Sequence, residues 1–280
     1  AWVARQRSAE QQAMRDYVST DQCRMEFLRR QLDDEGAVPC GRCDNCAGAW
    51  VDSSVSEQAL TGAMKELDRP GVEIEPRRMW PTGMPALGIE LKGRIPAGQQ
   101  CSTGRALGRL SDIGWGNRLR PLLAENAADG PVPDDVLKAA VAVLADWARS
   151  PGGWASNVPD ASARPVGVVA MPSLTRPQLV ASLAQGIAAI GRLPFLGTLT
   201  YTGSASGHTA RRSNSAQRLK ALSGALTVSE ELAGALRDSP GPVLLVDDYT
   251  DSGWTLAVAA RLLRQSGGEQ VLPLVLAAAG

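Results

Sequence analysis

Four cysteines near the start of the chain constrain its fold more than any other feature. Cys40, Cys43 and Cys46 form two overlapping C-x-x-C steps within seven residues, and Cys23 lies on a preceding amphipathic stretch. This spacing places three thiolates around one ion and lets Cys23 supply a fourth, which is the ligand set of tetrahedral zinc. Three sulfurs so close together suit two unstrained disulfides poorly. We therefore expect a structural Zn²⁺ bound by all four cysteines, with no coordination position left for water.

The residues around these cysteines resemble the zinc-binding subdomain of RecQ-family DNA helicases, in which a Cys-Arg helix and a C-G-x-C-D-x-C loop share one zinc. Residues 23–30 and 40–46 carry the likeness, which extends over about residues 14–50. It implies an intact protein that unwinds DNA with ATP, 3′ to 5′, in repair or recombination. The chain has no G-x-x-x-x-G-K-[ST] phosphate loop and begins at Ala1 without a methionine. We therefore expect the C-terminal part of a longer protein, whose ATPase core is its partner in cis and holds the ATP.

Composition points to a reducing compartment and away from membranes. The 280 residues are 44% apolar, enough for two or three small cores. With four of five cysteines assigned to the metal, Cys101 is left alone, as is usual in the cytoplasm. No charged leader precedes an apolar run, and no stretch has the length of a membrane span. We expect a cytoplasmic protein, at the nucleoid of a bacterial cell, without a membrane partner.

A basic segment between residues 77 and 120 predicts contact with DNA. The formal net charge of the chain is zero, yet this segment carries eight basic residues against two acids, Glu90 and Asp112. The basic residues are Arg77, Arg78, Lys92, Arg94, Arg105, Arg109, Arg118 and Arg120. Such side chains neutralise the phosphates of a duplex, fork or junction without reading its sequence, while Trp80 or Trp115 stacks on a base. The alternative is a solvated basic face with its tryptophans in the core.

A second motif, near the C-terminus, has the pattern of a phosphate-binding strand, loop and helix. The apolar run of residues 243–246 predicts a buried strand with Asp247 and Asp248 at its carboxyl end, and an apolar helix over residues 256–263 follows. In an open parallel sheet, ligands bind at this end of the strands. The backbone amides of residues 251–255 and the hydroxyls of Ser252 and Thr255 are suited to hold a phosphate at a helix N-terminus.

This motif resembles the phosphoribosyl pyrophosphate (PRPP) signature of type I phosphoribosyltransferases. The resemblance implies PRPP bound together with Mg²⁺, with the two acids on the ribose hydroxyls and the metal. The implied ligand-binding residues are Asp247, Asp248, Asp251, Ser252, Gly253 and Thr255. Asp251 also takes the place of the catalytic base near the acceptor nitrogen. Residues 173–176 correspond to the pyrophosphate-side loop, and residues 211–219 are loosely similar to competence-type (ComF-like) relatives. The alternative is that the two acids merely cap a turn.

The expected elements divide the chain into three parts of a multi-domain α/β protein. Residues 1–52 form a helical zinc-binding module, residues 53–155 a winged-helix-like α+β module that binds DNA, and residues 156–280 a phosphoribosyltransferase-like parallel α/β domain. The patterns predict helices over residues 2–34, 56–67, 104–125, 134–149, 177–190 and 256–263. They predict strands over residues 72–75, 88–93, 165–172, 195–201, 243–246 and 270–276.

Three functions follow from these modules. In the first, the chain is the DNA-binding and regulatory region of a RecQ-like helicase, and its transferase-like domain serves for binding. In the second, that domain is an active phosphoribosyltransferase, although the few residues after 276 offer no hood to grip an acceptor. In the third, the domain is a scaffold for protein partners. The order of the modules favours the first, because it resembles the tail of a bacterial RecQ-like helicase subgroup that carries an extra domain.

Overall fold

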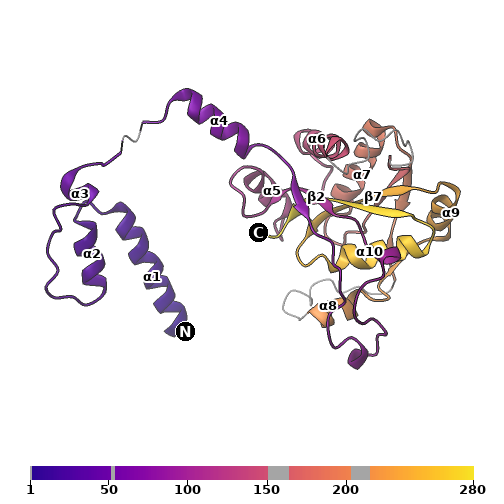
Figure 1. Ribbon diagram of the computed structural model, residues 1–280, viewed down its shortest axis with the longest axis horizontal. Helices are drawn as coiled ribbons and strands as arrows, with labels where there is room; N and C mark the ends of the chain where they lie inside the picture. Colours follow the sequence, from indigo (N-terminus) through magenta and orange to yellow (C-terminus); the bar gives the residue numbers. More distant parts are fainter. Residues whose placement is uncertain (1, 52–53, 151–163, 203–214) are drawn as a thin grey trace. The chain divides into compact units, whose positions relative to one another are not determined.

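The computed structural model describes residues 2–51, 54–150, 164–202 and 215–280. The chain forms two compact units, Ala1–Gly62 and Ala63–Gly280, each with its own architecture (Figure 1). Residues 211–214 of the predicted ComF-like stretch, which include Arg211 and Arg212, lie outside the described residues.

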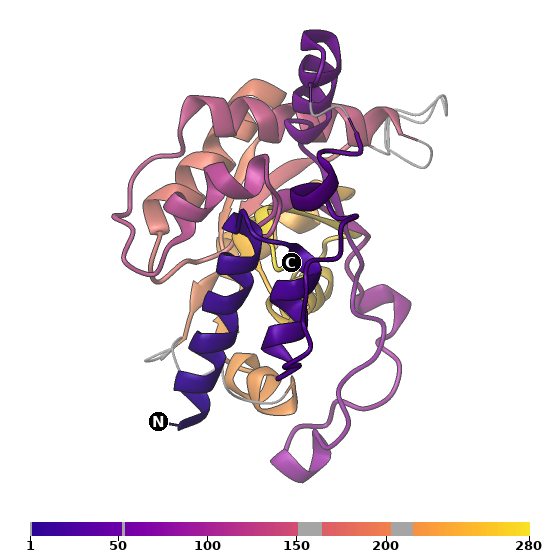
Figure 2. The same ribbon diagram turned by 90° about the vertical axis from the view of Figure 1, so that its left-hand side faces the viewer.

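The first unit consists of short helices around a cysteine loop. Helix α1 (Trp2–Ser19) lies beside α2 (Arg24–Gln31), and the one-turn helix α3 (Asp44–Ala47) follows the loop (Figure 2). Cys23 is the N-cap of α2, where its Sγ accepts a hydrogen bond from the Glu26 amide at 3.4 Å. The predicted helix behind Ser56 is α4 (Glu57–Leu67), which spans the boundary between the two units. The cysteine that starts α2 is thus also a predicted metal ligand.

The second unit is built on a six-stranded, mostly parallel sheet. Its strands lie in the order β1-β2-β8-β7-β3-β4, and only β1 runs antiparallel to its neighbour. Their bounds are β1 Val72–Ile74, β2 Gly104–Arg109, β3 Gly167–Ala170, β4 Phe195–Thr198, β7 Pro242–Thr250 and β8 Gln270–Ala278. A small separate sheet pairs β5 (Thr200–Tyr201) with β6 (Leu226–Thr227). The mixed α/β class expected from the sequence is therefore present.

Helices cover both faces of the sheet. On one face lie α5 (Trp115–Leu123), α6 (Asp134–Arg149) and α7 (Pro177–Gly191). On the other lie α8 (Ser215–Leu222), α9 (Glu230–Asp238) and α10 (Trp254–Gln265), and Figure 1 shows α6 and α7 opposite α10 across the sheet. Side chains alternate along β7, so Leu244 and Val246 enter the first core while Val243 and Leu245 enter the second. Burial on both faces explains the continuous apolar run.

The segment predicted as one interrupted helix over residues 104–125 is a strand followed by a helix. Residues 104–109 form β2, which runs parallel to β8, and only Trp115–Leu123 is helical. Two glycines permit this close packing. A Cβ added to Gly104 would lie 2.8 Å from the Pro273 carbonyl oxygen, and one on Gly108 would lie 2.8 Å from the Trp115 Cβ. The helix prediction was therefore wrong at this strand.

The structure divides the chain differently from the three expected parts. Residues 72–74 and 104–109 belong to the same sheet as the C-terminal strands, and α5 and α6 share a core with α7. The predicted strand over residues 88–93 is not regular, although Trp80, Met84 and Ile95 around it are buried in the second core. The apolar side chains of this segment are buried against the sheet domain. Among the described residues of 53–155, the buried side chains therefore pack into the cores of the sheet domain and not into a separate core as the predicted winged-helix-like module would require.

Candidate functional site

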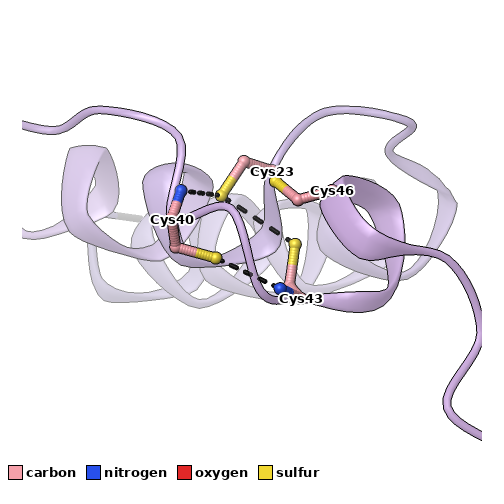
Figure 3. A group of neighbouring side chains, drawn as sticks. All are labelled: Cys23, Cys40, Cys43 and Cys46. Atoms are coloured by element: carbon pink, nitrogen blue, oxygen red, sulfur yellow. Dashed lines mark hydrogen bonds between the residues drawn. The ribbon is translucent and has the colours of Figure 1, made fainter.

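The four predicted cysteine ligands come together in the first unit. The Sγ atoms of Cys23, Cys40, Cys43 and Cys46 all lie within 4.8 Å of one another, and none forms a disulfide (Figure 3). The Sγ atoms of Cys43 and Cys23 are 3.9 Å apart. A tetrahedral zinc ion with Zn–S bonds of about 2.3 Å separates its sulfurs by about 3.8 Å. The cluster therefore has the size and the ligands of a structural metal site.

Backbone amides point at the sulfurs of this cluster. The Cys40 amide donates to Cys23 Sγ at 3.1 Å, and the Cys43 amide donates to Cys40 Sγ at 3.3 Å (Figure 3). The first of these bonds is the main reason that the pKa of Cys23 is lowered to about 6. By contrast, the hydrogen bond with Cys43 raises the pKa of Cys46 to about 11. Because four close thiolates repel one another, all of them ionise together only around a cation, and the residues fit a metal ion.

The residues between the cysteines hold the cluster closed. Arg24 Nε donates to both carboxylate oxygens of Asp44, at 2.8 and 2.9 Å, and its Nη1 donates to the Tyr17 carbonyl at 2.7 Å. Asn45 Nδ2 donates to the carbonyls of Thr20 and Gln22, at 2.6 and 2.7 Å. These bonds tie α3 to the turn between α1 and α2. The polar residues of the cysteine motif thus keep Cys23 beside the other three ligands.

The second unit has a cleft at its topological switch point. From β3 the chain passes through α7 to β4 on one side, and from β7 it passes through α10 to β8 on the other. In such sheets the crevice between the two diverging connections binds ligands. A cleft of about 280 Å³ lies here, which we name the switch-point cleft. It is lined by Glu125, residues 172–176, Tyr201, Asp247, Asp248, Tyr249 and Thr255.

The two predicted acids lie within β7 rather than after it. The strand continues to Thr250 because β8 pairs with it as far as Ala278, so Asp247 and Asp248 are buried. Burial, and secondly the charge of Asp248, raises the pKa of Asp247 well above its usual range. Asp248 Oδ2 accepts a hydrogen bond from Arg176 Nη1 at 2.9 Å, and the two side chains form an ion pair. The acids therefore meet the predicted pyrophosphate-side loop at residue 176.

The predicted phosphate loop leads into α10. Gly253 is the N-cap of this helix with φ +72°, a backbone conformation that glycine adopts without strain, and Thr255 lines the cleft. Asp251, the predicted base, forms an ion pair with Arg218 at 2.8 Å. The structure thus brings Asp247, Asp248 and Thr255 together in the cleft, with Asp251 paired outside its lining.

Arg77, which the sequence analysis assigned to DNA, contacts the 251–255 loop. Its Nε donates to the Ser252 carbonyl at 2.6 Å, and its guanidinium lies 4.9 Å from the centre of the Trp254 ring. Trp80 stacks on Trp254 with the ring centres 6.3 Å apart. The two partners of the hydrogen bond are 175 residues apart. No local sequence signal could have indicated this contact.

The other predicted DNA-binding residues differ in how freely their side chains could contact a DNA phosphate. Arg105 pairs with Glu73 and lies over the Trp147 ring, and Arg118 pairs with Asp68 and lies over the Trp115 ring. Arg78 pairs with Glu75 at 3.5 Å, and Arg120 donates to the Leu110 carbonyl and to Asn117. Lys92, Arg94 and Arg109 are exposed. Trp80 and Trp115 are buried, so neither is placed to stack on a base as predicted.

Two comparisons with known proteins gave no match. No model of a known protein family matches the chain, and no curated protein matches it. Among the described residues, no helix is both long and apolar enough to cross a membrane. The function therefore has to be inferred from the residues and geometry of the chain itself.

Proposed function

We propose that this chain is the C-terminal, DNA-binding and regulatory region of a RecQ-like DNA helicase. The cysteine cluster carries this proposal, since the cysteines and three polar residues of the motif make contacts there. The cysteines offer four sulfurs to one ion, while Arg24, Asp44 and Asn45 tie their helices together. In this proposal the ion is Zn²⁺, and the ATPase core lies in the same intact protein. Elemental analysis should find one zinc per chain, and a chain without metal would overturn the assignment.

DNA contact is the second part of this proposal, and the exposed basic residues are its best test. Reversing Lys92 and Arg109 to glutamate should weaken binding to forked DNA and flatten its salt dependence, by about one unit of slope per lost phosphate contact. Arg105 is a poorer target because its side chain is 19% exposed and pairs with Glu73. Lys138→Glu, on the exposed side of α6, is the matched control. Unchanged affinity across a salt series would rule out DNA contact by this segment.

The α/β unit in this proposal binds a phosphorylated ribose such as PRPP in the switch-point cleft. Three features support this ligand: two acids for ribose hydroxyls, a helix N-terminus for phosphate, and their placement where a parallel sheet binds ligands. Ligand at 100 times its dissociation constant adds about 2.7 kcal/mol to the unfolding free energy. A thermal shift with millimolar PRPP should show this, and Asp247→Asn with Asp248→Asn should abolish it. If PRPP does not raise the melting temperature of the wild type, the cleft does not bind this ligand.

An active phosphoribosyltransferase is the second candidate. Asp251 supports it, since a carboxylate stands in the 251–255 loop where the resemblance implies a base. In that reaction an acceptor nitrogen attacks C1 of PRPP, the C1–O bond breaks, and pyrophosphate leaves with the electron pair. Asp251 takes the proton that the acceptor nitrogen loses. Release of pyrophosphate from PRPP in the presence of a purine base would support it, and Asp251→Asn should then slow the release. The ion pair of Asp251 with Arg218 instead favours a binding role.

A further inference from the structure

Arg176 is a cation built into the switch-point cleft. Its Nη1 donates to Asp248 Oδ2 at 2.9 Å, and its other two nitrogens donate to backbone carbonyls at the end of α5. Nε bonds the Leu122 oxygen at 3.1 Å, and Nη2 bonds those of Leu123 at 2.7 Å and Ala124 at 3.1 Å. The last carbonyls of a helix carry partial negative charge, which favours a cation. Its hydrogen bonds therefore fix the guanidinium in one position.

The Arg176–Asp248 pair is largely withdrawn from solvent. The side chains are only 12% and 11% exposed, in contrast to 67% and 64% for the pair of Arg149 with Asp146 on α6. Poor access to water strengthens the attraction within the cleft pair and its repulsion of any second cation. Breaking a buried pair also leaves a charge without a partner, which is strongly unfavourable. A metal ion cannot displace this guanidinium as readily as it would displace water.

The acids of the cleft do not fit the Mg²⁺ that the transferase resemblance implies. Magnesium needs near-octahedral oxygen ligands and keeps several waters, so it requires free carboxylate oxygens and room around them. One oxygen of Asp248 is taken by Arg176, and Asp247 Oδ1 accepts the Asp248 amide at 2.9 Å. Among the described residues that line the cleft, Arg176 is the only one with a positively charged side chain. The position beside Asp248 is therefore already held by a positive charge.

Resting on the proposed ribose-phosphate ligand, we propose that the Arg176 guanidinium takes the place of the divalent cation, so that the cleft binds a phosphorylated ribose without Mg²⁺. The ribose hydroxyls then meet the remaining oxygens of Asp247 and Asp248, and the phosphate meets the 251–255 loop. A merely structural pair that joins α5 to the sheet makes a different prediction. In that case the loss of Arg176 lowers stability but leaves the metal requirement of binding unchanged.

The test is the effect of Mg²⁺ on PRPP binding to the full chain, measured by titration calorimetry. Divalent ions are removed from the buffer with a resin, because a soluble chelator would also strip the cysteine site. For the wild type, adding millimolar MgCl₂ should not tighten binding. For Arg176→Gln, which leaves Asp248 free, Mg²⁺ should tighten binding by about tenfold. Arg149→Gln breaks the exposed Arg–Asp pair instead and should behave like the wild type.

The outcomes distinguish the proposed ligand, PRPP, from the proposed role of Arg176 in place of Mg²⁺. A wild type that binds PRPP only with Mg²⁺ overturns the role of Arg176 and leaves the proposed ligand standing. An Arg176→Gln chain that binds without gaining a response to Mg²⁺ also overturns it. No PRPP binding by the wild type under either condition overturns both the ligand and the inference. If Arg176→Gln fails to fold, the wild-type comparison with and without MgCl₂ still decides the question.

Discussion

The two units of this chain stabilise their folds by different means. Among the described residues of the first 62, Cys23 is the only one that is buried. In the second unit, apolar side chains fill one core on each face of the sheet. Ordering a backbone costs about 1–2 kcal/mol per residue, and burial of apolar surface usually offsets it. The first unit lacks that burial, so in the proposed zinc site the bound ion would contribute most of its stability.

The ion pairs of the first unit are too weak to replace the metal. Arg24 and Asp44 have side chains that are 25% and 46% exposed, and Arg29 and Asp34 are 39% and 38% exposed. Exposed pairs of this sort contribute about 0.2–1 kcal/mol each. Structural zinc sites in small peptides contribute apparent binding free energies of about 10–16 kcal/mol. In the proposed zinc site, the polar contacts orient the helices and the ion would hold them folded.

Removing the metal should therefore unfold the first unit and leave the second unit folded. In Cys43→Ser, or after chelation, we expect residues 1–62 to lose amide protection while residues 63–280 keep theirs. Hydrogen exchange followed by mass spectrometry reports the two units separately. Cys101→Ala, which removes the one cysteine outside the cluster, is the matched control and should keep the first unit protected. Protected amides in residues 1–62 of the metal-free chain would contradict this account.

A cavity in the sheet core should destabilise the second unit and leave the first unit unchanged. Leu274 on β8 is fully buried in the first core, so Leu274→Ala should lower the unfolding free energy of the second unit by about 2–5 kcal/mol. Metal content and amide protection of residues 1–62 should not change. Ile190→Ala, on a side chain that is 53% exposed, should change the unfolding free energy by less than about 0.5 kcal/mol. Loss of the metal from Leu274→Ala would show that the units are not independent.

The sequence predicted best those features whose residues lie close together along the chain. The cysteine cluster needs one short loop and one preceding helix, and all four of its ligands converge as expected. The run from β7 through the 251–255 loop to α10 is equally local, because strand, turn and helix follow one another directly. Helix α6 has the predicted bounds, since Pro133 precedes it and its apolar face is regular.

The features that were missed depend on partners far away in the sequence. β2 is a strand because it pairs with β8, about 170 residues later, and its own residues carry little strand preference. Arg77 meets Ser252, and Arg176 meets Asp248 across 72 residues. A count of charges along the sequence placed Arg77 on a DNA surface, because such a count contains no information on long-range pairings. Sheet order is what turns these distant residues into one site.

The buried acid of the cleft should make the second unit sensitive to pH. Since the pKa of Asp247 is raised in the folded state, folding favours its protonated form. This contribution is fully present below the usual carboxyl pKa of about 4 and is lost as pH rises toward the folded pKa. Asp247→Asn resembles the protonated form, so its melting temperature should exceed that of the wild type at pH 7.

The difference in melting temperature between Asp247→Asn and the wild type should narrow as the pH is lowered toward about 4. A melting series of the second unit over this range measures it. Asp146→Asn, on an exposed α6 side chain, is the control and should show no such trend. A gap between wild type and Asp247→Asn that stays constant with pH would show that Asp247 ionises normally in the fold.

Arg77 offers the finest test of the two roles proposed for the second unit, contact with DNA and binding of PRPP. Its guanidinium lies at the 251–255 loop, so Arg77→Ala should weaken binding of PRPP by about tenfold, or roughly 1.4 kcal/mol. Arg78, its neighbour, pairs with Glu75 instead, and Arg78→Ala should leave PRPP affinity unchanged. Titration of PRPP and of forked DNA into both variants separates the two assignments. If Arg77→Ala weakens only DNA binding, this residue belongs to the DNA surface that its sequence context predicted, and the phosphate loop works without it.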